Sequence, residues 1–202
     1  MNISELIKTR RSIREYKPDP VPKKLIQEVV EAGIWAPSSM NRQPWRFVVV
    51  TNDEKRKFLA EEAKKELGKF LNTAEGKAHW GADVAKRFAK RAQSPEDMIF
   101  YDAPAIIFII QRIDVGNEFD FGLAAQNMML FAHDKGLGTC PIGLSKYLAN
   151  SPESRKILGM KKDVRRTPDS SGEKLILSLT LGYPAESPEA SERDMDVVEW
   201  VE

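Results

Sequence analysis

Residues 36–50 read Ala36-Pro37-Ser38-Ser39-Met40-Asn41-Arg42-Gln43-Pro44-Trp45-Arg46-Phe47-Val48-Val49-Val50, a polar loop that runs directly into an apolar, β-branched segment. Two prolines restrict the loop backbone, so the loop loses little conformational entropy when it becomes ordered. Its hydroxyl and amide side chains offer donors and acceptors together, as a planar heteroaromatic ligand with alternating donor and acceptor edges requires. A polar helix-to-strand connection without function is the common alternative for one such loop.

The chain on either side of this loop predicts helices interleaved with a few buried strands. Strands are expected at residues 45–50, 105–110, 137–143 and 174–181, and the second is so continuously apolar that we expect it to be buried on both faces. Helices are expected at residues 2–9, 23–36, 51–67, 75–91, 117–135 and 151–158. We therefore expect an α+β or mixed α/β fold, with residues 1–202 forming a single domain around one central sheet.

Several local signals mark the ends of these helices. Asn2 with Glu5 and Thr51 with Glu54 have capping-box spacing, and Asn117 with Asp120 can open the helix at 117–135. That helix is apolar or small nearly all round, which predicts a central position or a subunit interface. Gly136 is a natural stop because glycine accepts the left-handed conformation.

Composition excludes several classes of protein. The 202 residues hold 31 Lys and Arg against 30 Asp and Glu, so the net charge of +1 disfavours nucleic acid and anionic lipid as partners. No apolar run approaches the roughly 20 residues that span a bilayer, and the N-terminus does not resemble a secretory signal. One cysteine, Cys140, excludes an intramolecular disulfide and a thiolate metal cluster. A cytoplasmic location is the resulting expectation.

A second candidate site precedes the loop. Arg10-Arg11-Ser12-Ile13-Arg14 places three guanidinium groups and a hydroxyl within five residues. Guanidinium matches phosphate oxygens in bidentate geometry, although an isolated basic cluster is more often a solvated turn. The sequence has neither the glycine fingerprint of a dinucleotide fold nor a P-loop, so side chains would have to build any anion site.

Five motifs together resemble the nitroreductase family of flavin mononucleotide (FMN) oxidoreductases. In order along the chain they are Arg10–Arg14, Ala36–Trp45, Ala125-Gln126-Asn127, Gly136–Gly143 and Leu181-Gly182-Tyr183-Pro184. They span most of the sequence. The resemblance implies a nitroreductase-like fold with a central mixed or antiparallel β-sheet flanked by helices, in a homodimer whose subunits are entwined and bind FMN at their interface.

The resemblance also assigns residues to the flavin. One subunit would contribute Arg10, Arg11, Ser12 and Arg14 around the phosphate, the ribityl chain and the ring edge, and Arg193 would close on the phosphate. Its partner would contribute Pro37, Ser38, Ser39, Asn41 and Gln43. Pro141, Ile142 and Gly143 would lie against the ring, with a backbone N–H of this segment directed at N5. No protein acid or nucleophile is needed, because the flavin carries out the redox chemistry.

The implied activity is hydride transfer from NADH or NADPH through FMN to nitroaromatic, quinone or related acceptors, in a ping-pong mechanism. Three alternatives stay open: reductive dehalogenation, oxygen-dependent flavin cleavage, and a non-catalytic flavin-binding module. The sequence does not identify the acceptor, the preferred nicotinamide or the sensitivity to oxygen. Phe70, Trp80 and Phe100 are candidates for the substrate side of the flavin.

Other chemically active side chains are assigned to structure. His79 and His133 are too isolated to bind a metal ion, Cys140 is expected to be a small core residue, and Met128 and Met129 are expected to fill the core. The helix at 54–69 is predicted to present a solvated charged face with Glu–Lys pairs four residues apart. The charged segment 163–173 either controls substrate access, if it lies near the cofactor, or decorates the surface, which is the interpretation that we favour.

Overall fold

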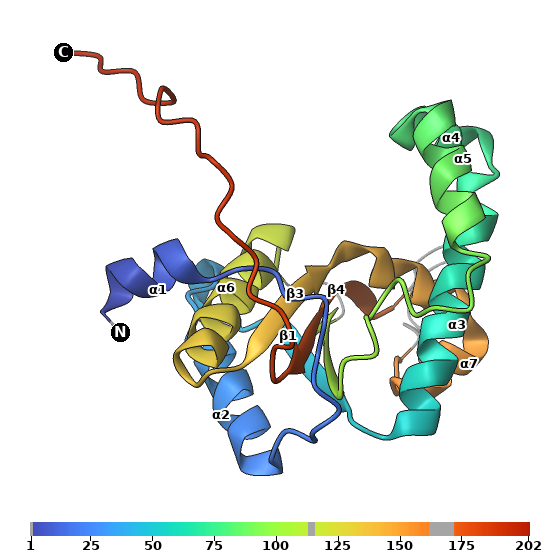
Figure 1. The fold of residues 1–202 in the computed structure, drawn as a ribbon, viewed down its shortest axis with the longest axis horizontal. Helices are drawn as coiled ribbons and strands as arrows, with labels where there is room; N and C mark the ends of the chain where they lie inside the picture. Colours follow the sequence, from blue (N-terminus) through green and yellow to red (C-terminus); the bar gives the residue numbers. More distant parts are fainter. Residues whose placement is uncertain (1, 113–115, 162–171) are drawn as a thin grey trace.

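The computed structural model describes residues 2–112, 116–161 and 172–202, and its centre is one four-stranded sheet (Figure 1). The strands are β1 (Trp45–Val50), β2 (Ala105–Gln111), β3 (Gly138–Ile142) and β4 (Lys174–Gly182). Their order in space is β1-β2-β4-β3, and all three pairings are antiparallel. The predicted α+β fold is therefore confirmed, with an antiparallel sheet.

The apolar run of β2 lies at the centre of the sheet. Ala105 through Ile110 are all buried, as the prediction of burial on both faces requires. β2 pairs with β1 from Trp45↔Gln111 to Val50↔Ile106, and with β4 from Ala105↔Leu181 to Gln111↔Lys174. β3 forms an edge, with Thr139 opposite Leu181 and Ile142 opposite Ser178.

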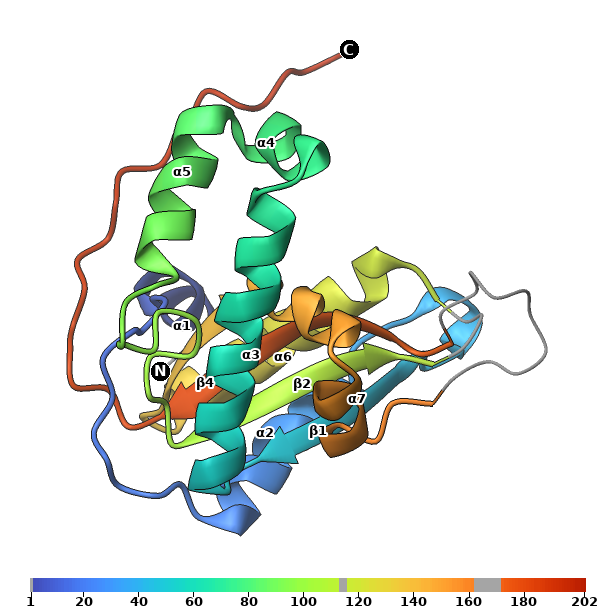
Figure 2. The ribbon, with the colours of Figure 1, turned by 90° about the vertical axis from the view of Figure 1, so that its right-hand side faces the viewer.

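Helices cover both faces of the sheet and create two cores (Figure 2). One core packs α2 (Lys23–Ile34) and α6 (Glu118–Asp134) against the side chains of one face, including Ile107, Ile109 and Leu179. The other packs α3 (Asp53–Leu71), the 3₁₀ segment η2 (Gly143–Asn150) and α7 (Pro152–Ile157) against Ile106, Phe108 and Ile110. Met128 and Met129 are buried in the first core, as predicted.

The helix ends follow local chemistry with one exception. Capping boxes open α1 (Ile3–Thr9) at Asn2 and α6 at Asn117. Thr51 was the wrong cap for α3, because the side chain of Asn52 accepts the N–H of Lys55 at 2.9 Å and the helix begins one residue later than expected. Gly136 has a φ of 74° just after α6, which confirms the predicted stop.

The predicted helix at 75–91 is two helices instead. α4 (Ala74–Trp80) and α5 (Ala82–Arg91) meet at Gly81, whose φ of 77° no helix can accommodate. Together with the end of α3 they form an arm that stands away from the sheet (Figures 1 and 2). The rings of Trp80 and Phe88 pack across this arm at 5.3 Å.

The charged face of α3 is less solvated than predicted. Lys64 is only 3% exposed and Glu66 only 6%. The buried ammonium group of Lys64 donates to the carbonyl oxygens of Ser94 and Glu96 at 3.0 and 3.3 Å. The Glu–Lys pairs on α3 are three residues apart rather than four, as in Glu61–Lys64 and Glu66–Lys69.

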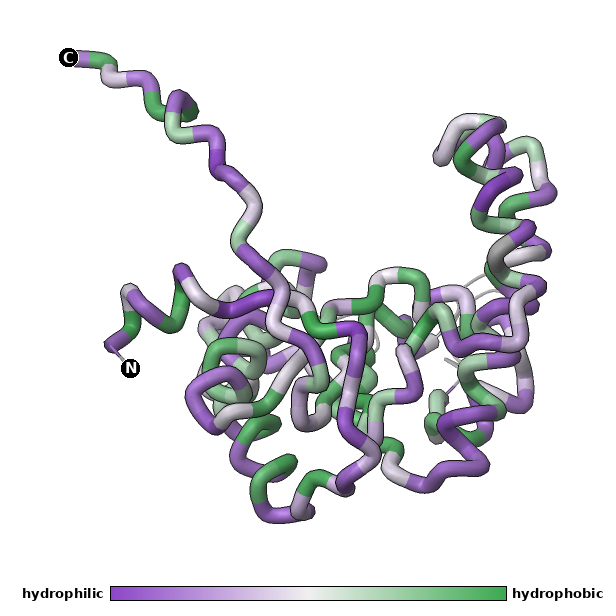
Figure 3. The backbone as a smooth tube through the Cα atoms, viewed as in Figure 1, coloured by the Kyte–Doolittle hydropathy of each residue, from purple (hydrophilic) through white to green (hydrophobic). Residues whose placement is uncertain are grey.

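Residues 185–202 leave the body of the structure as an extended segment without helix or strand (Figure 1). Hydrophilic residues predominate along it, with shorter apolar stretches between them (Figure 3), and Trp200 is 86% exposed. Most of the charged segment 163–173 lies outside the described residues. Within the described ranges, none of the helices combines the length and apolarity that crossing a bilayer requires.

Candidate functional site

The arginine cluster is docked along the outer edge of β3. Ser12 forms a parallel bridge with Thr139, and the N–H of Ile13 donates to the carbonyl of Thr139 at 3.0 Å. The Tyr16 hydroxyl donates to the carbonyl of Ile13 at 2.6 Å, and burial raises the pKa of Tyr16. Segment 10–14 is therefore fixed against the sheet at its backbone, so its arginine side chains are not needed to hold it there.

The close approach of this segment to β3 depends on Gly138. A Cβ atom at this position would lie 2.8 Å from both Cβ and Cγ1 of Ile13, closer than ordinary van der Waals contact. On the opposite side, the Glu186 carboxylate accepts the backbone N–H groups of Arg14 and Glu15. The arginine segment is thus held between β3 and the extended run that follows β4.

Arg10 and Arg11 line a cavity of about 340 Å³ next to this edge. Nη1 of Arg10 is buried and has no hydrogen-bond partner within the described structure. Burial, Arg11 and Arg193 all lower the pKa of Arg10. A buried, unpaired guanidinium nitrogen beside a second arginine is a costly arrangement, which an anion hydrogen-bonded to this nitrogen would relieve. The donor set therefore fits a phosphate group.

Arg11 is already partly engaged. Its Nη1 donates to the carbonyls of Lys8 and Arg10, each at 2.7 Å, at the C-terminal end of α1. Arg193 lies in the extended tail, where its Nη1 donates to the carbonyl of Ser191 at 3.4 Å. Its charge nevertheless reaches Arg10, as the lowered pKa of Arg10 indicates. Its role on the phosphate stays a prediction.

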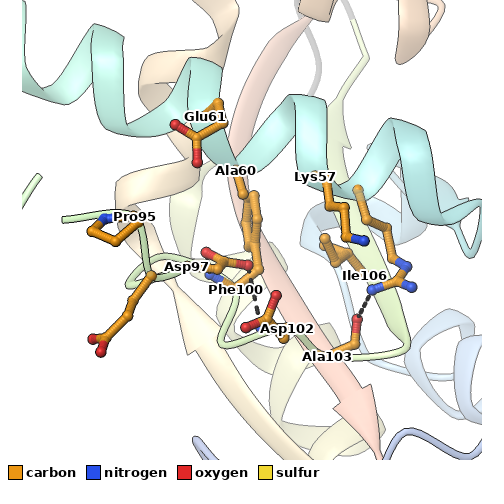
Figure 4. A pocket seen from close by; sticks show the side chains of 11 residues that line it. Lys57, Ala60, Glu61, Pro95, Asp97, Phe100, Asp102, Ala103 and Ile106 are labelled. Atoms are coloured by element: carbon orange, nitrogen blue, oxygen red, sulfur yellow. Dashed lines mark hydrogen bonds between the residues drawn. The ribbon is translucent and has the colours of Figure 1, made fainter. Parts of the chain in front are cut away.

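Arg14 lies over an aromatic ring that the sequence did not single out. Its guanidinium carbon is 5.9 Å from the centre of the Tyr101 ring. Tyr101 and Asp102 both have left-handed backbone conformations, with φ of 57° and 51°. The Asp97 carboxylate holds this strained turn by accepting the N–H groups of Ile99, Phe100 and Asp102 at 2.8–3.2 Å. Figure 4 shows Asp97 close to Phe100 and Asp102. Burial raises the pKa of Asp97.

Segment 141–143 is on the same edge as the arginines. Pro141 is exposed, whereas the side chain of Ile142 is buried in the core beneath η2. Ile142 could therefore contact a flavin ring only through its backbone. A Cβ atom added to Gly143 would meet nothing within 4 Å, so a flat ligand has open access to the backbone there.

The loop at 36–45 is strained, and its residues 39–43 are exposed. Met40, Asn41 and Gln43 have φ values of 54°, 52° and 46°, which costs about 1–3 kcal/mol for each residue that is not glycine. The loop is stabilised internally by the N–H of Gln43, which donates to Oγ of Ser38 at 2.9 Å. The N–H of Ser39 donates to Asp120 at the start of α6 at 3.3 Å. Strain of this kind is typical of a functional site, because ordinary connections avoid it.

Within one chain the sheet separates this loop from the arginine segment. The loop enters β1 at Trp45, opposite Gln111, whereas Ser12 flanks β3 at Thr139, opposite Leu181. β1 and β3 are the two edges of the sheet, and these residues are at its opposite ends. Three strand spacings and about six residues separate the two corners by roughly 25 Å. The structure thus brings segments 10–14 and 141–143 together, but not residues 37–43.

Gly143 lines a second cavity, of about 370 Å³. Trp80, Leu144, Leu175 and Ile176 supply its apolar walls. Of the three aromatic residues considered for the substrate side, Trp80 is thus next to the predicted ring position. Phe100 is buried in the core, and Phe70 packs on Tyr147 with ring centres 4.7 Å apart.

The remaining candidates are structural, with one qualification. Cys140 is buried in β3, and the described residues hold no group of His, Cys, Asp and Glu that could bind a metal ion. His79 packs edge-on against Trp80 at 5.7 Å. His133 is on a helix, as expected, but it also lines the cavity of Arg10 and Arg11. No spacing rule relates His133 or Tyr101 to the arginines, because only the fold brings them together.

The fold and these side chains define an α+β protein with a cavity lined by Arg10 and Arg11 on one edge of its sheet. Residues 7–183 match the nitroreductase family. A candidate NADH dehydrogenase or NAD(P)H nitroreductase of Methanothermobacter thermautotrophicus is 28% identical over 93% of this chain and 80% of its own length. The 4-nitrobenzoate reductase of Pseudomonas putida is 26% identical over 90% of this chain and 85% of its own length.

A solved structure has the same fold. The nitroreductase of Bacteroides fragilis with bound FMN superposes with a TM-score of 0.77 at 26% identity, over 100% of each chain. The chain therefore belongs to the nitroreductase family. The family resemblance predicted from five motifs is confirmed.

Proposed function

We propose that this protein is an FMN-dependent oxidoreductase that transfers hydride from NADH or NADPH to a nitroaromatic, quinone or related acceptor. The observation that carries the proposal is the cavity beside β3, where Nη1 of Arg10 is buried without a partner among the described residues. Family membership and the FMN in the Bacteroides fragilis relative support the identity of the cofactor. The names of the Methanothermobacter and Pseudomonas relatives support the nicotinamide donor and the nitroaromatic acceptor.

The residues of this chain have distinct tasks in the proposal. Arg10, Arg11 and Arg193 hold the phosphate, while Ser12 and Arg14 bind further along the cofactor. Guanidinium groups near the pyrimidine edge of a flavin stabilise the negative charge of its reduced form, and Tyr101 holds Arg14 in place for that purpose. FMN, when bound, supplies the two-electron redox chemistry, with one substrate bound after the other as in a ping-pong mechanism.

The same proposal includes a homodimer in which the loop of the partner subunit completes the site. Pro37, Ser38, Ser39, Asn41 and Gln43 are too far from the arginine segment to reach a ligand bound there in their own chain. The ends of α2 and the loop also present apolar side chains to solvent, with Trp35 80% and Met40 81% exposed. An unpartnered groove of about 1,140 Å³ runs between α2 and β1 next to them. Such surfaces are typical of subunit interfaces.

The first experiment is an anaerobic visible spectrum of the purified protein, reconstituted with FMN and then treated with NADH or NADPH. Bleaching of bound flavin by either nicotinamide would support the redox enzyme and identify its donor. Bound flavin that neither donor reduces would contradict the proposed activity and favour the non-catalytic module. Absence of FMN binding would contradict the cofactor itself.

Composite sites can be tested by complementation. We expect Arg10→Ala and Asn41→Ala homodimers each to lose FMN, because every site in them is damaged. A co-expressed heterodimer has one site carrying both substitutions and one intact site, and it should bind one FMN per dimer. If the loop instead acts on the cavity of its own chain, each site in the heterodimer stays damaged and no binding returns.

The cytoplasmic location and the single domain of residues 1–202 stay predictions.

A further inference from the structure

His133 shares the cavity that Arg10 and Arg11 line, although it comes from the last turn of α6. Its Nε2 is 2.9 Å from Oγ1 of Thr9. The Thr9 hydroxyl donates to the carbonyl of Glu5 at 2.7 Å, so Thr9 accepts from Nε2–H of the neutral imidazole. Protonation of His133 would therefore take place at Nδ1 without breaking this hydrogen bond.

The surroundings of His133 make its charge depend on what fills the cavity. Partial burial, Arg10 and Arg11 lower the pKa of the imidazole, and Asp134 opposes them. The Glu186 carboxylate also lines the cavity, but it accepts the N–H groups of segment 14–15. With the cavity empty, two guanidinium charges disfavour a third cation.

A phosphate dianion reverses this balance. Gly136 and Leu137 place the C-terminal end of α6 at the wall of the cavity, and this end of a helix carries a negative partial charge. A cation in the last turn offsets that charge, and it also attracts the phosphate. His133 is the titratable side chain of α6 that lines the cavity.

We propose that His133 is a further residue of the FMN phosphate site, and that it takes up a proton when the phosphate binds. This inference rests on the proposed function, since it needs FMN in the cavity. It adds to the arginines a group whose charge changes near neutral pH. FMN should therefore bind more tightly as the pH falls, because binding and protonation of His133 favour each other.

The test is the dissociation constant of FMN, measured by quenching of flavin fluorescence between pH 6.5 and 8.5. This range lies above the second phosphate ionisation near pH 6, so the ligand is largely a dianion throughout. In the wild type we expect the constant to rise about two- to fivefold across the range, because the pKa of His133 starts below its ordinary value and should rise by about one unit on binding. His133→Gln should bind more weakly at pH 6.5 and converge with the wild type at pH 8.5.

Two controls isolate the charge on the phosphate. His79→Gln should behave as the wild type, because His79 packs on Trp80 in the arm rather than at the cavity. Riboflavin lacks the phosphate, so its binding should change equally little with pH in all three proteins. His133→Gln with the same pH dependence as the wild type would overturn the inference.

Proton NMR supplies a readout that needs no activity. The chain contains two histidines, so the two variants assign both imidazole Cε1–H signals. The pKa of His133 should rise when FMN is added and stay unchanged with riboflavin. If FMN binds and is reduced by a nicotinamide but the pKa of His133 does not move, only this inference fails. If FMN does not bind, the proposed function fails with it.

Discussion

Gly138→Ala should weaken cofactor binding without touching any side chain assigned to the cofactor. The added methyl group would lie 2.8 Å from Cβ and Cγ1 of Ile13, so segment 10–14 must move outward by about 0.6 Å to reach an ordinary contact of 3.4 Å. Gly138 has no left-handed φ, so alanine itself adds no backbone strain. The substitution therefore tests the close approach alone.

Two magnitudes follow from this displacement. Overpacking costs about 1–3 kcal/mol, which in a chain of this size lowers Tm by roughly 2–4 °C for each kcal/mol. A shift of about 0.6 Å can also break one charge-assisted hydrogen bond between an arginine and the phosphate. This loss costs about 1.5–3 kcal/mol, so the dissociation constant of FMN should rise roughly 10- to 100-fold.

The assay is FMN binding followed by flavin fluorescence, together with thermal unfolding of the protein without cofactor. Gly68→Ala is the matched control, because a Cβ atom there meets nothing within 4 Å and alanine favours the interior of α3 by about 0.5–1 kcal/mol. If Gly138→Ala binds FMN as tightly as this control, the contact between Gly138 and Ile13 does not set the position of the arginines.

Three further predictions concern the supports of the site. Glu173→Gln should destabilise the protein by about 1–2 kcal/mol at pH 7, because it weakens the partly buried pair with Arg46 at 2.7 Å. Burial alone would raise the pKa of Glu173, but Arg46 and the N–H of Lys161 hold it below its ordinary value. Urea unfolding should therefore show the difference shrinking as the pH falls from about 4.5 through the lowered pKa of this carboxyl in the folded state. A difference independent of pH would contradict the assignment. Asp97→Ala should lower Tm by roughly 4–8 °C, because three N–H groups lose their acceptor at a cost of about 2 kcal/mol in total. Asp97→Asn keeps one acceptor oxygen, so its Tm should fall less. Tyr101→Leu should weaken FMN binding about two- to tenfold because it removes the ring beneath Arg14, and Tyr101→Phe should leave binding unchanged. If both variants lose the same affinity for FMN in a fluorescence titration, the hydroxyl rather than the ring matters.

Local chemistry accounts for the features that were predicted correctly. The capping boxes at Asn2 and Asn117 and the stop at Gly136 depend on a few neighbouring atoms, so a short window of sequence contains their causes. The apolar run of β2 has the same property, because its burial follows from its composition. The family could be recognised for a related reason: its motifs keep their order along the chain.

The incorrect predictions concern choices between locally equivalent options. Thr51 and Asn52 are both competent caps, and the structure uses Asn52, whose side chain accepts the N–H of Lys55. Lys64 has the composition of a solvated residue, but it is buried because the carbonyls of Ser94 and Glu96 come from a distant segment to meet it. No pattern within α3 contains that information.

Most of the elements, the family and the residue types of a phosphate site can be predicted from the sequence. Which of those residues meet depends on the tertiary structure. The strand order β1-β2-β4-β3 places segment 10–14 beside Thr139 and the loop at 37–43 at the opposite corner, and it brings His133 and Tyr101 to the arginines. Strand order and register depend on the packing of both faces of the sheet at once, and a local pattern of residues does not encode that cooperative balance.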